Sequence, residues 1–418
     1  MLKLHATPFA AGRARGRIEH SKSKAGPDVL LVATQSELTD FNAPCAGLIV
    51  INGAPFSHIM ARILGQAIPT VMIDAEQAQA LHRGMELVLD GGSGWLYSAD
   101  LLEEMPPEAV FPPLDRAGTL TTRDGQAIEL RASVGSPAAA QRAVALGASA
   151  IGLLRSEYLG FDSRTPPSAD LLERELAACV QAAASLPTTI RLPDIAADKL
   201  PRWCQGMPGL ENPLGPRGVR LYDREPLRST VQALAQAAGR VAQRREMRLL
   251  LPFLTHPEEY RHHRNAIEAL LPAPLAIGAM IETPAAALMI DEFLGSADFV
   301  ALGCNDLMQG LFAADRDIAE LGGLLNPYAP AIFRLLRHVA RDAGERVAQI
   351  QVNGLLSALP GVLPVLLGLG YRIFCVDPLL IAPLAHTIRQ TDIDQAERLA
   401  EIVSLAEDAA EVRQVLAL

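Results

Sequence analysis

The chain has 418 residues, which is long enough for two domains, one of them large. Half of the residues are hydrophobic and 20% are charged, as in a packed globular protein rather than a disordered one. The formal net charge of −10 argues against non-specific binding to nucleic acid, which requires a basic face. It does not argue against a small anionic ligand, because local arginines decide that.

The sequence predicts a cytoplasmic protein without membrane segments. No apolar run is long enough to span a bilayer, and residues 1–5 lack the apolar core of a signal peptide. The cysteines are odd in number, scattered and without a CxxC pair, so we expect reduced thiols at Cys45, Cys179, Cys204, Cys304 and Cys375.

Residues 1–98 are expected to form a small α/β domain, because short apolar runs alternate there with breaks rich in Gly, Pro and Ser. The stretch 99–126 carries four prolines and a polar run at 121–125. Proline disfavours regular structure, so this stretch is interpreted as a linker.

Residues 127–418 alternate regularly between strand-like apolar runs and helical stretches rich in Ala, Leu and Arg. Eight parallel strands with crossover helices over this length predict a (β/α)₈ TIM barrel. The strands are expected to begin near Ile128, Ala150, Thr188, Met247, Ala276, Phe299, Val347 and Tyr371.

Charged residues follow several of these strands at the point where each strand ends. Arg155 follows the second strand, Arg191 ends the third, Glu282 follows the fifth and Asp306 follows the sixth. Each alone could be a solvated strand end. Because barrel enzymes build their sites at the carboxyl ends of the strands, several such residues on one rim predict an active site.

The residue types at this rim suit a small, multiply anionic ligand with a metal. Glu282 and Asp306 supply hard oxygen ligands for Mg²⁺. The fork of an arginine side chain matches phosphate and carboxylate oxygens in pairs. The candidate arginines are Arg155, Arg191, Arg217 and Arg316. The alternative is that these arginines stabilise the rim of the barrel through ion pairs with Glu157, Asp194 or Asp198.

The barrel sequence resembles the phosphoenolpyruvate-utilising enzymes: Enzyme I of the sugar phosphotransferase system, phosphoenolpyruvate synthase and pyruvate phosphate dikinase. The resemblance implies that the arginines clamp the phosphate and carboxylate, that Glu282 and Asp306 bind Mg²⁺, and that Asn305 contacts the ligand. The matching segments follow the family order, at 152–159, 190–195, 212–217, 281–286, 305–309 and 315–316.

The first domain resembles the swivelling phosphohistidine domain of the same family. Residues 53–58 match the approach to its phosphorylated histidine and residues 67–71 match the exit, which implies that His58 is the phosphoryl carrier. Free backbone N–H groups at a helix N-terminus favour the added negative charge. The match departs from the family pattern at 59–62, where Ile-Met-Ala-Arg follows the histidine at once. Outside this context, a histidine beside a helix is more often a packing or surface residue.

A larger departure falls at the seventh strand. The family carries Cys-Gly-Glu there, and its cysteine protonates the enolate of pyruvate at carbon three, whereas this chain has Asn353, Gly354 and Leu355. An amide cannot act as a general acid at neutral pH. Cys304 and Cys375 also lie near the predicted mouth, where they are expected to be small buried hydrophobic residues.

The sequence therefore predicts an Mg²⁺-dependent phosphotransferase that moves a phosphoryl group from phosphoenolpyruvate to His58, with a separate protein or small molecule as acceptor. Two alternatives stay open: a sensor that binds phosphoenolpyruvate or pyruvate without catalysis, and a lyase or mutase acting on a 2-oxo acid or phosphonate. Since related barrels often dimerise, we also expect a homodimer formed through the barrel.

Overall fold

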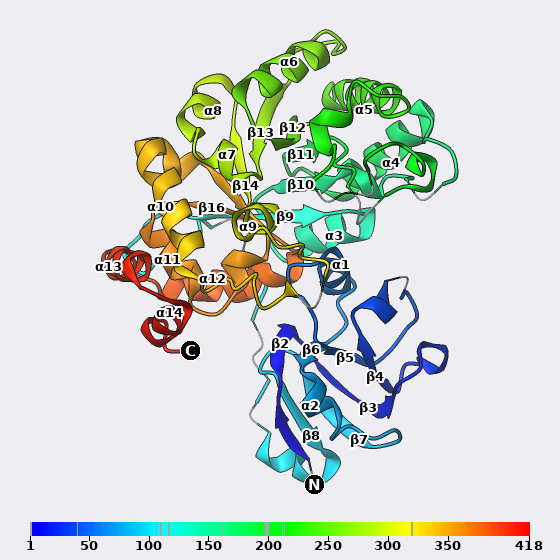
Figure 1. Cartoon of the computed structure of the whole chain (residues 1–418), viewed down its shortest axis with the longest axis vertical. Coiled ribbons are helices and arrows are strands. Elements are labelled where there is room, and N and C mark those ends of the chain that lie inside the picture. Colours follow the sequence, from blue (N-terminus) through cyan, green and yellow to red (C-terminus); the bar gives the residue numbers. More distant parts are fainter. Residues whose placement is uncertain are drawn as a thin grey trace. The chain divides into compact units, whose positions relative to one another are not determined.

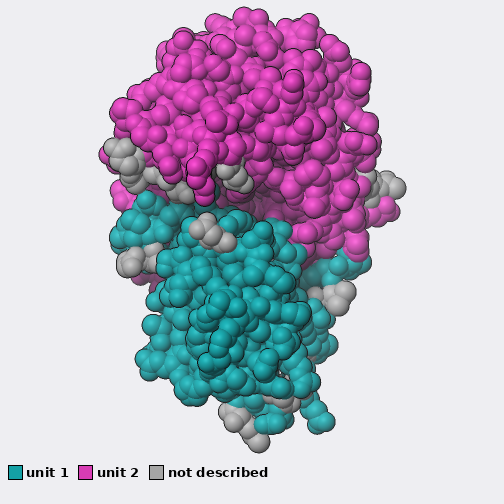
Figure 2. Space-filling view, turned by 90° about the vertical axis from the view of Figure 1, so that its right-hand side faces the viewer, with its two compact units in different colours: residues 1–112, 315–324 teal, residues 113–314, 325–418 magenta. Residues whose placement is uncertain are grey.

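The computed structural model describes residues 2–39, 41–105, 107–108, 111–115, 118–161, 163–196, 200–210, 212, 214–318 and 321–418. These residues form two compact units, which are coloured separately in Figure 2. Unit 1 comprises residues 1–112 and 315–324, and unit 2 comprises residues 113–314 and 325–418. A short segment that follows the sixth barrel strand in sequence therefore belongs to unit 1.

The domain boundaries expected from the sequence, 1–98 and 127–418 with a linker over 99–126, stay a prediction. Compactness alone does not show which part of a chain folds independently.

Unit 1 contains a mixed sheet of eight strands, counted over the described residues, in the order β1-β8-β7-β3-β4-β5-β6-β2. Strands β3, β4, β5 and β6 pair in parallel and the other pairs are antiparallel. The strands are β1 Lys3–His5, β2 Thr7–Ala10, β3 Arg13–Glu19, β4 Val29–Thr34, β5 Gly47–Ile51, β6 Thr70–Ile73, β7 Glu86–Asp90 and β8 Trp95–Ser98.

Both faces of this sheet are covered by hydrophobic side chains. Along β4, Leu30 belongs to one core cluster and Leu31 to the other, because successive side chains of a strand point to opposite faces. Helix α1 (His58–Gly65) packs Met60 and Ile63 into the second cluster. The short helix α2 (Ala75–Ala78) follows β6.

Unit 2 is a closed barrel of eight strands among the described residues, and all neighbouring strands pair in parallel (Figure 1). The last strand closes on the first, with Cys375 opposite Arg131. The strands are β9 Glu129–Val134, β10 Ile151–Arg155, β11 Thr188–Arg191, β12 Met247–Leu254, β13 Ala276–Ile281, β14 Val300–Gly303, β15 Gln351–Asn353 and β16 Ile373–Val376.

Helices connect the barrel strands and surround them. Local signals begin several of them: Ser136 caps α3 ahead of Pro137, and Thr283 caps α7 ahead of Pro284. The helices are α3 Pro137–Ala145, α4 Ala169–Ala182, α5 Leu227–Ala242, α6 Pro257–Glu268, α7 Pro284–Ala287, α8 Ile290–Ser296, α9 Cys304–Phe312, α10 Pro330–Ala343, α11 Val362–Gly368, α12 Ile381–Gln390, α13 Ile393–Leu405 and α14 Ala409–Val415.

The predicted α/β barrel is confirmed, and six of its predicted strand starts lie within one residue of the described ones. The start predicted near Val347 is wrong. Residues 344–349 form a 3₁₀ helix after α10, and β15 begins only at Gln351. Gly344 adopts a positive φ of 57°, so the chain turns there, and the apolar Val347 packs against Gly370 before the strand starts.

Among the described residues, no helix is both long enough and apolar enough to cross a bilayer.

Candidate active site

The carboxyl ends of the barrel strands place the predicted site residues on one rim. Arg191 is the last residue of β11, and Asp194 follows three positions later. Glu282 comes directly after β13. Asp306 lies in the first turn of α9, which starts where β14 ends. Because all these strands run in parallel, their carboxyl ends meet at the mouth of the barrel.

Asp194, Glu282 and Asp306 form a buried group of carboxylates, each offering one oxygen within 4.8 Å of the others. Their exposed fractions are 0%, 1% and 7%. The sequence predicts Glu282 and Asp306 as ligands but assigns Asp194 only an ion-pairing role. The sequence signal for Asp194 is its position just past β11, on the same rim.

Two arginines pair with these carboxylates. The fork of Arg217 donates to Asp194 through Nε at 3.1 Å and Nη2 at 2.9 Å, and its Nη1 lies 2.7 Å from Asp306. The Nη1 of Arg191 lies 3.3 Å from Asp194 and 3.4 Å from Glu282, while its Nη2 pairs with Glu157. Both arginines therefore form ion pairs of the expected kind, and both lie at the predicted rim; their contact with a ligand stays a prediction.

Among the described residues of this cluster, the four carboxylates of Glu157, Asp194, Glu282 and Asp306 lie near the two guanidinium groups of Arg191 and Arg217. Burial raises the pKa of Glu282 to about 7, Arg191 opposes this rise, and the nearby Asp306 adds to it. Carboxylate oxygens are hard donors and fit a divalent cation such as Mg²⁺.

The backbone around Glu282 holds its side chain in place. The N–H of Phe253 donates to Glu282 Oε2 at 2.9 Å. Thr283 caps α7 and donates from its hydroxyl to the carbonyl of Leu254. A Cβ atom at Gly303 would lie 2.4 Å from Glu282 Cγ, so the end of β14 has room for this carboxylate only because residue 303 is glycine.

Donor groups for an anionic ligand also lie at the strand ends. Arg155 ends β10 and is half-buried, and none of the described residues forms a hydrogen bond or ion pair with its guanidinium. The Nε of Arg191 is buried and finds no hydrogen-bond acceptor among the described residues. Both arginines can therefore still donate N–H groups to a ligand.

Asn305 and Asn353 are held by the backbone around the sixth and seventh strands. Asn305 Oδ1 accepts from the N–H of Leu355 at 3.2 Å, and a Cβ atom at Gly354 would lie 2.5 Å from that oxygen. Asn353 is buried, donates to the carbonyl of Leu302 at 3.2 Å and accepts from Gln351 Nε2 at 2.9 Å. The Asn353 amide therefore has a structural role within the barrel.

Cys304 and Cys375 are fully buried, as expected of small hydrophobic residues. Burial raises the pKa of each thiol to about 12, which makes both groups weaker acids than an exposed cysteine. We therefore do not expect either thiol to replace the acid that the resemblance places at position 353.

His58 is the first residue of α1, after the capping residue Ser57. Within unit 1, the segment 315–324 contacts it: His58 N donates to Asp317 Oδ1 at 2.9 Å, and Nδ1 lies 3.4 Å from Asp317 Oδ2. Arg316 Nη2 lies 3.0 Å and 2.8 Å from the two ring nitrogens. The sequence predicts Arg316 as a ligand residue, and the structure places it beside His58. Asp317 was missed, because nothing in the sequence relates it to a histidine 259 positions earlier.

A parallel eight-stranded barrel with arginines and buried carboxylates at its carboxyl rim defines a barrel enzyme for a small anionic ligand. Comparison with known proteins gives the family: the description "PEP-utilising enzyme, PEP-binding domain" matches residues 115–393, more than half of the chain. The chain belongs to the phosphoenolpyruvate-utilising enzymes, as its resemblance predicts.

Relatives match the chain beyond the barrel. It is 32% identical over 395 residues to a phosphoenolpyruvate-protein phosphotransferase of Haloferax volcanii, covering 89% of this chain and 68% of that protein. It is 31% identical over 409 residues to a multiphosphoryl transfer protein of Xanthomonas campestris pv. campestris, covering 93% of this chain and 48% of that protein. A phosphoenolpyruvate-protein phosphotransferase of Geobacillus stearothermophilus is 30% identical over 380 residues, covering 85% of this chain and 64% of that protein.

Proposed function

We propose that this chain is an Mg²⁺-dependent phosphotransferase that takes the phosphoryl group of phosphoenolpyruvate onto His58 and passes it to a separate acceptor. The observation that carries the proposal is the buried group of Asp194, Glu282 and Asp306, which lies among arginines at the barrel mouth. Three carboxylate oxygens this close together are ligands that Mg²⁺ prefers, and arginine side chains pair with phosphate and carboxylate groups, so a metal-bound phosphate suits both.

The names of the relatives support phosphotransfer from phosphoenolpyruvate to proteins. The chain spans 68% of the Haloferax protein and 48% of the Xanthomonas protein, so the activity and partners of those whole proteins come to this chain as part of the proposal.

In the proposed site, Arg155 and Arg191 donate N–H groups to the phosphate and carboxylate oxygens of the ligand, and Asn305 contacts the ligand as well. Glu282 and Asp306, joined by Asp194, hold the Mg²⁺, which when bound neutralises charge on the phosphate oxygens. Arg217 keeps Asp194 and Asp306 in place through its ion pairs.

In the proposed transfer, Asp317 accepts a hydrogen bond from Nδ1–H of His58, which leaves the lone pair of Nε2 as the nucleophile. Nε2 forms a bond to phosphorus while the bond from phosphorus to the enol oxygen breaks, and that oxygen keeps the electron pair. Arg316 Nη2 lies 2.8 Å from Nε2, so in the proposed step the guanidinium turns from this nitrogen to the phosphoryl oxygens and offers them its positive charge. Enolpyruvate then leaves and takes its proton at carbon three from water to give pyruvate.

The test is to incubate the full chain with phosphoenolpyruvate and Mg²⁺, and to measure acid-labile phosphate on the chain and pyruvate in solution. We expect both, and we expect His58→Ala to lose all labelling while phosphoenolpyruvate binding persists, because binding belongs to the barrel. His20→Ala, a histidine elsewhere in unit 1, serves as control and should keep its label. Labelling that survives His58→Ala would refute the assignment of the carrier.

A second candidate function is a sensor that binds phosphoenolpyruvate or pyruvate without turnover. Asn353 and Leu355 favour it, since the acid and the carboxylate that the family carries at these positions are absent. A sensor would bind phosphoenolpyruvate with Mg²⁺ but show neither phosphate on the chain nor pyruvate in solution.

A further inference from the structure

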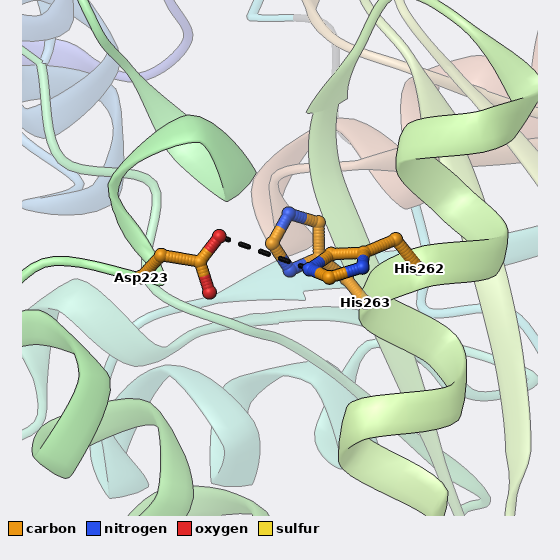
Figure 3. A group of neighbouring side chains, drawn as sticks. All are labelled: Asp223, His262 and His263. Atoms are coloured by element: carbon orange, nitrogen blue, oxygen red, sulfur yellow. Dashed lines mark ion pairs between the residues drawn. The ribbon is translucent and has the colours of Figure 1, made fainter.

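Two histidines and an aspartate gather on unit 2 at a place that the proposed reaction does not use. His262 and His263 are consecutive residues of α6, and Asp223 lies in the loop between a 3₁₀ turn (Gly218–Leu221) and α5. Their ligand atoms all lie within 4.8 Å of one another. In Figure 3 the Asp223 carboxylate faces the two imidazole rings, which lie next to each other.

The two rings lie closer together than is usual for consecutive side chains of a helix. Successive residues of an α-helix point about 100° apart around its axis. The rings of His262 and His263 nevertheless approach to 4.8 Å between centroids, with 80° between their planes. One nitrogen of each ring also lies within 4.8 Å of a carboxylate oxygen of Asp223.

One member of the group is fixed by packing. His263 is buried, and its ring contacts Tyr222 edge-on at 5.5 Å between centroids. Tyr222 is held in turn by its hydroxyl, which donates to the carbonyl of Pro193 at 3.0 Å. Because Tyr222 precedes Asp223 in the chain, the same contact places the backbone of Asp223 near this ring. Asp223 and His262 are exposed, which leaves coordination positions open to water.

We propose that Asp223, His262 and His263 bind a divalent transition metal of the zinc, nickel or copper class. Two imidazole nitrogens and a carboxylate oxygen are the donor set that such metals prefer, whereas Mg²⁺ prefers oxygen ligands alone. His262 Nε2 and Asp223 Oδ2 lie 3.8 Å apart. Ligand atoms at about 2.1 Å from a tetrahedral metal lie about 3.4 Å apart, so a small side-chain rotation completes the geometry.

The metal would join two segments of the barrel. Asp223 and Arg217 lie on either side of the 3₁₀ turn Gly218–Leu221, in the segment between β11 and α5, and both histidines belong to α6. A bound metal thereby fixes the loop that positions Arg217 at the mouth. It also stabilises the folded chain, since the unfolded chain does not hold these three groups together.

The test uses the full chain without a histidine tag, stripped with a chelator and kept in excess Mg²⁺ so that the mouth carboxylates are not open to the probe. Zn²⁺ is titrated by calorimetry, and Co²⁺ is added to record its visible absorption. We expect one equivalent of Zn²⁺ at neutral pH. We also expect a Co²⁺ spectrum of low coordination number and a higher melting temperature with Zn²⁺.

His262→Gln and Asp223→Asn alter exposed side chains, so they should fold normally and weaken Zn²⁺ binding at least tenfold. His338→Gln is the matched control, because His338 pairs with Asp342 on α10 and no metal-binding group of three among the described residues includes it, and it should bind Zn²⁺ like the unaltered chain. Absence of Zn²⁺ binding by the unaltered chain would overturn the proposal. So would unchanged binding by His262→Gln and Asp223→Asn, or loss of binding in Glu282→Gln alone.

Discussion

At the scale of single residues, burial decides which charges at the barrel mouth are costly. Glu282 is buried among other carboxylates, and the two arginines only partly offset the loss of water, so its pKa lies near 7 rather than 4.5. We expect the charged Glu282 side chain to destabilise the folded protein when no cation is bound. This cost can be measured as a change in the free energy of unfolding.

Glu282→Gln should stabilise the metal-free protein at pH 8 while abolishing Mg²⁺-dependent phosphoenolpyruvate binding. The folded-state pKa is raised, so the charged form costs stability above pH 7 and nothing below about pH 4.5. The gain is at most about 3 kcal/mol, at about 1.4 kcal/mol per pKa unit. Thermal melts at pH 8 and pH 4 measure it, and calorimetry measures binding. Asp306→Asn should likewise lose Mg²⁺-dependent binding. Unchanged ligand affinity in both variants would show that the metal assignment is wrong.

Asp317→Asn should slow phosphorylation of His58 without changing phosphoenolpyruvate affinity. The amide can still accept from the N–H of His58, but it no longer offers a charge to Nδ1. A hydrogen bond to a charged group is worth about 1.5–3 kcal/mol, so the rate should fall roughly ten- to a hundredfold. Single-turnover labelling across pH checks this, because a positioning role also shifts the pH profile. An unchanged rate and profile would leave Asp317 a helix cap only.

At the scale of elements, the sequence predicts the positions of the strands better than it predicts which side chains meet at their carboxyl ends. Alternating apolar strands and Ala-rich helices locate most strand starts, because each strand is a continuous buried run bounded by turns. The same rule fails at Val347, whose apolar side chain packs in a 3₁₀ helix. Asp194 was predicted as an ion-pair partner but missed as a neighbour of Glu282 and Asp306, and Asp317 was missed altogether, because these contacts join segments far apart in the chain.

Gly303→Ala should disrupt the proposed metal site through the end of β14. The new methyl group would lie 2.4 Å from Glu282 Cγ and 2.6 Å from its Oε1, so the carboxylate must move away from Asp194 and Asp306. We expect Mg²⁺-dependent phosphoenolpyruvate binding to fall at least tenfold in calorimetry. Gly295→Ala in α8, where a Cβ atom meets nothing within 4 Å, is the control and should bind normally. Equal binding by both variants would mean that the position of Glu282 is unimportant.

At the scale of the whole molecule, the proposed reaction divides between the units. The candidate ligand site is built from strand ends of unit 2, and the candidate nucleophile opens a helix of unit 1. Phosphoryl transfer needs the nucleophile, the cations and the metal, whereas proton transfer at carbon three needs an acid at the other end of the ligand. This chain has the histidine that phosphoryl transfer needs, but it lacks the cysteine that supplies the proton in the family.

Forward phosphorylation of His58 should therefore be detectable but slow, and the reverse step nearly absent. In the reverse direction pyruvate must lose a proton from carbon, and Asn353 cannot take it, because an amide has no basic lone pair at neutral pH. The Asn353 amide is also hydrogen-bonded to Leu302 and Gln351, and the raised pKa values of Cys304 and Cys375 keep both thiols protonated.

Asn353→Cys should raise the rate of the reverse step. The increase should be modest, because Leu355 stands where the family has a carboxylate. Formation of phosphoenolpyruvate from pyruvate and labelled protein measures that rate, and Asn353→Ser, which removes the amide without adding a thiol, is the control. Efficient reverse transfer by the unaltered chain would show that another group supplies the proton, and Cys304 and Cys375 would then be the next residues to replace.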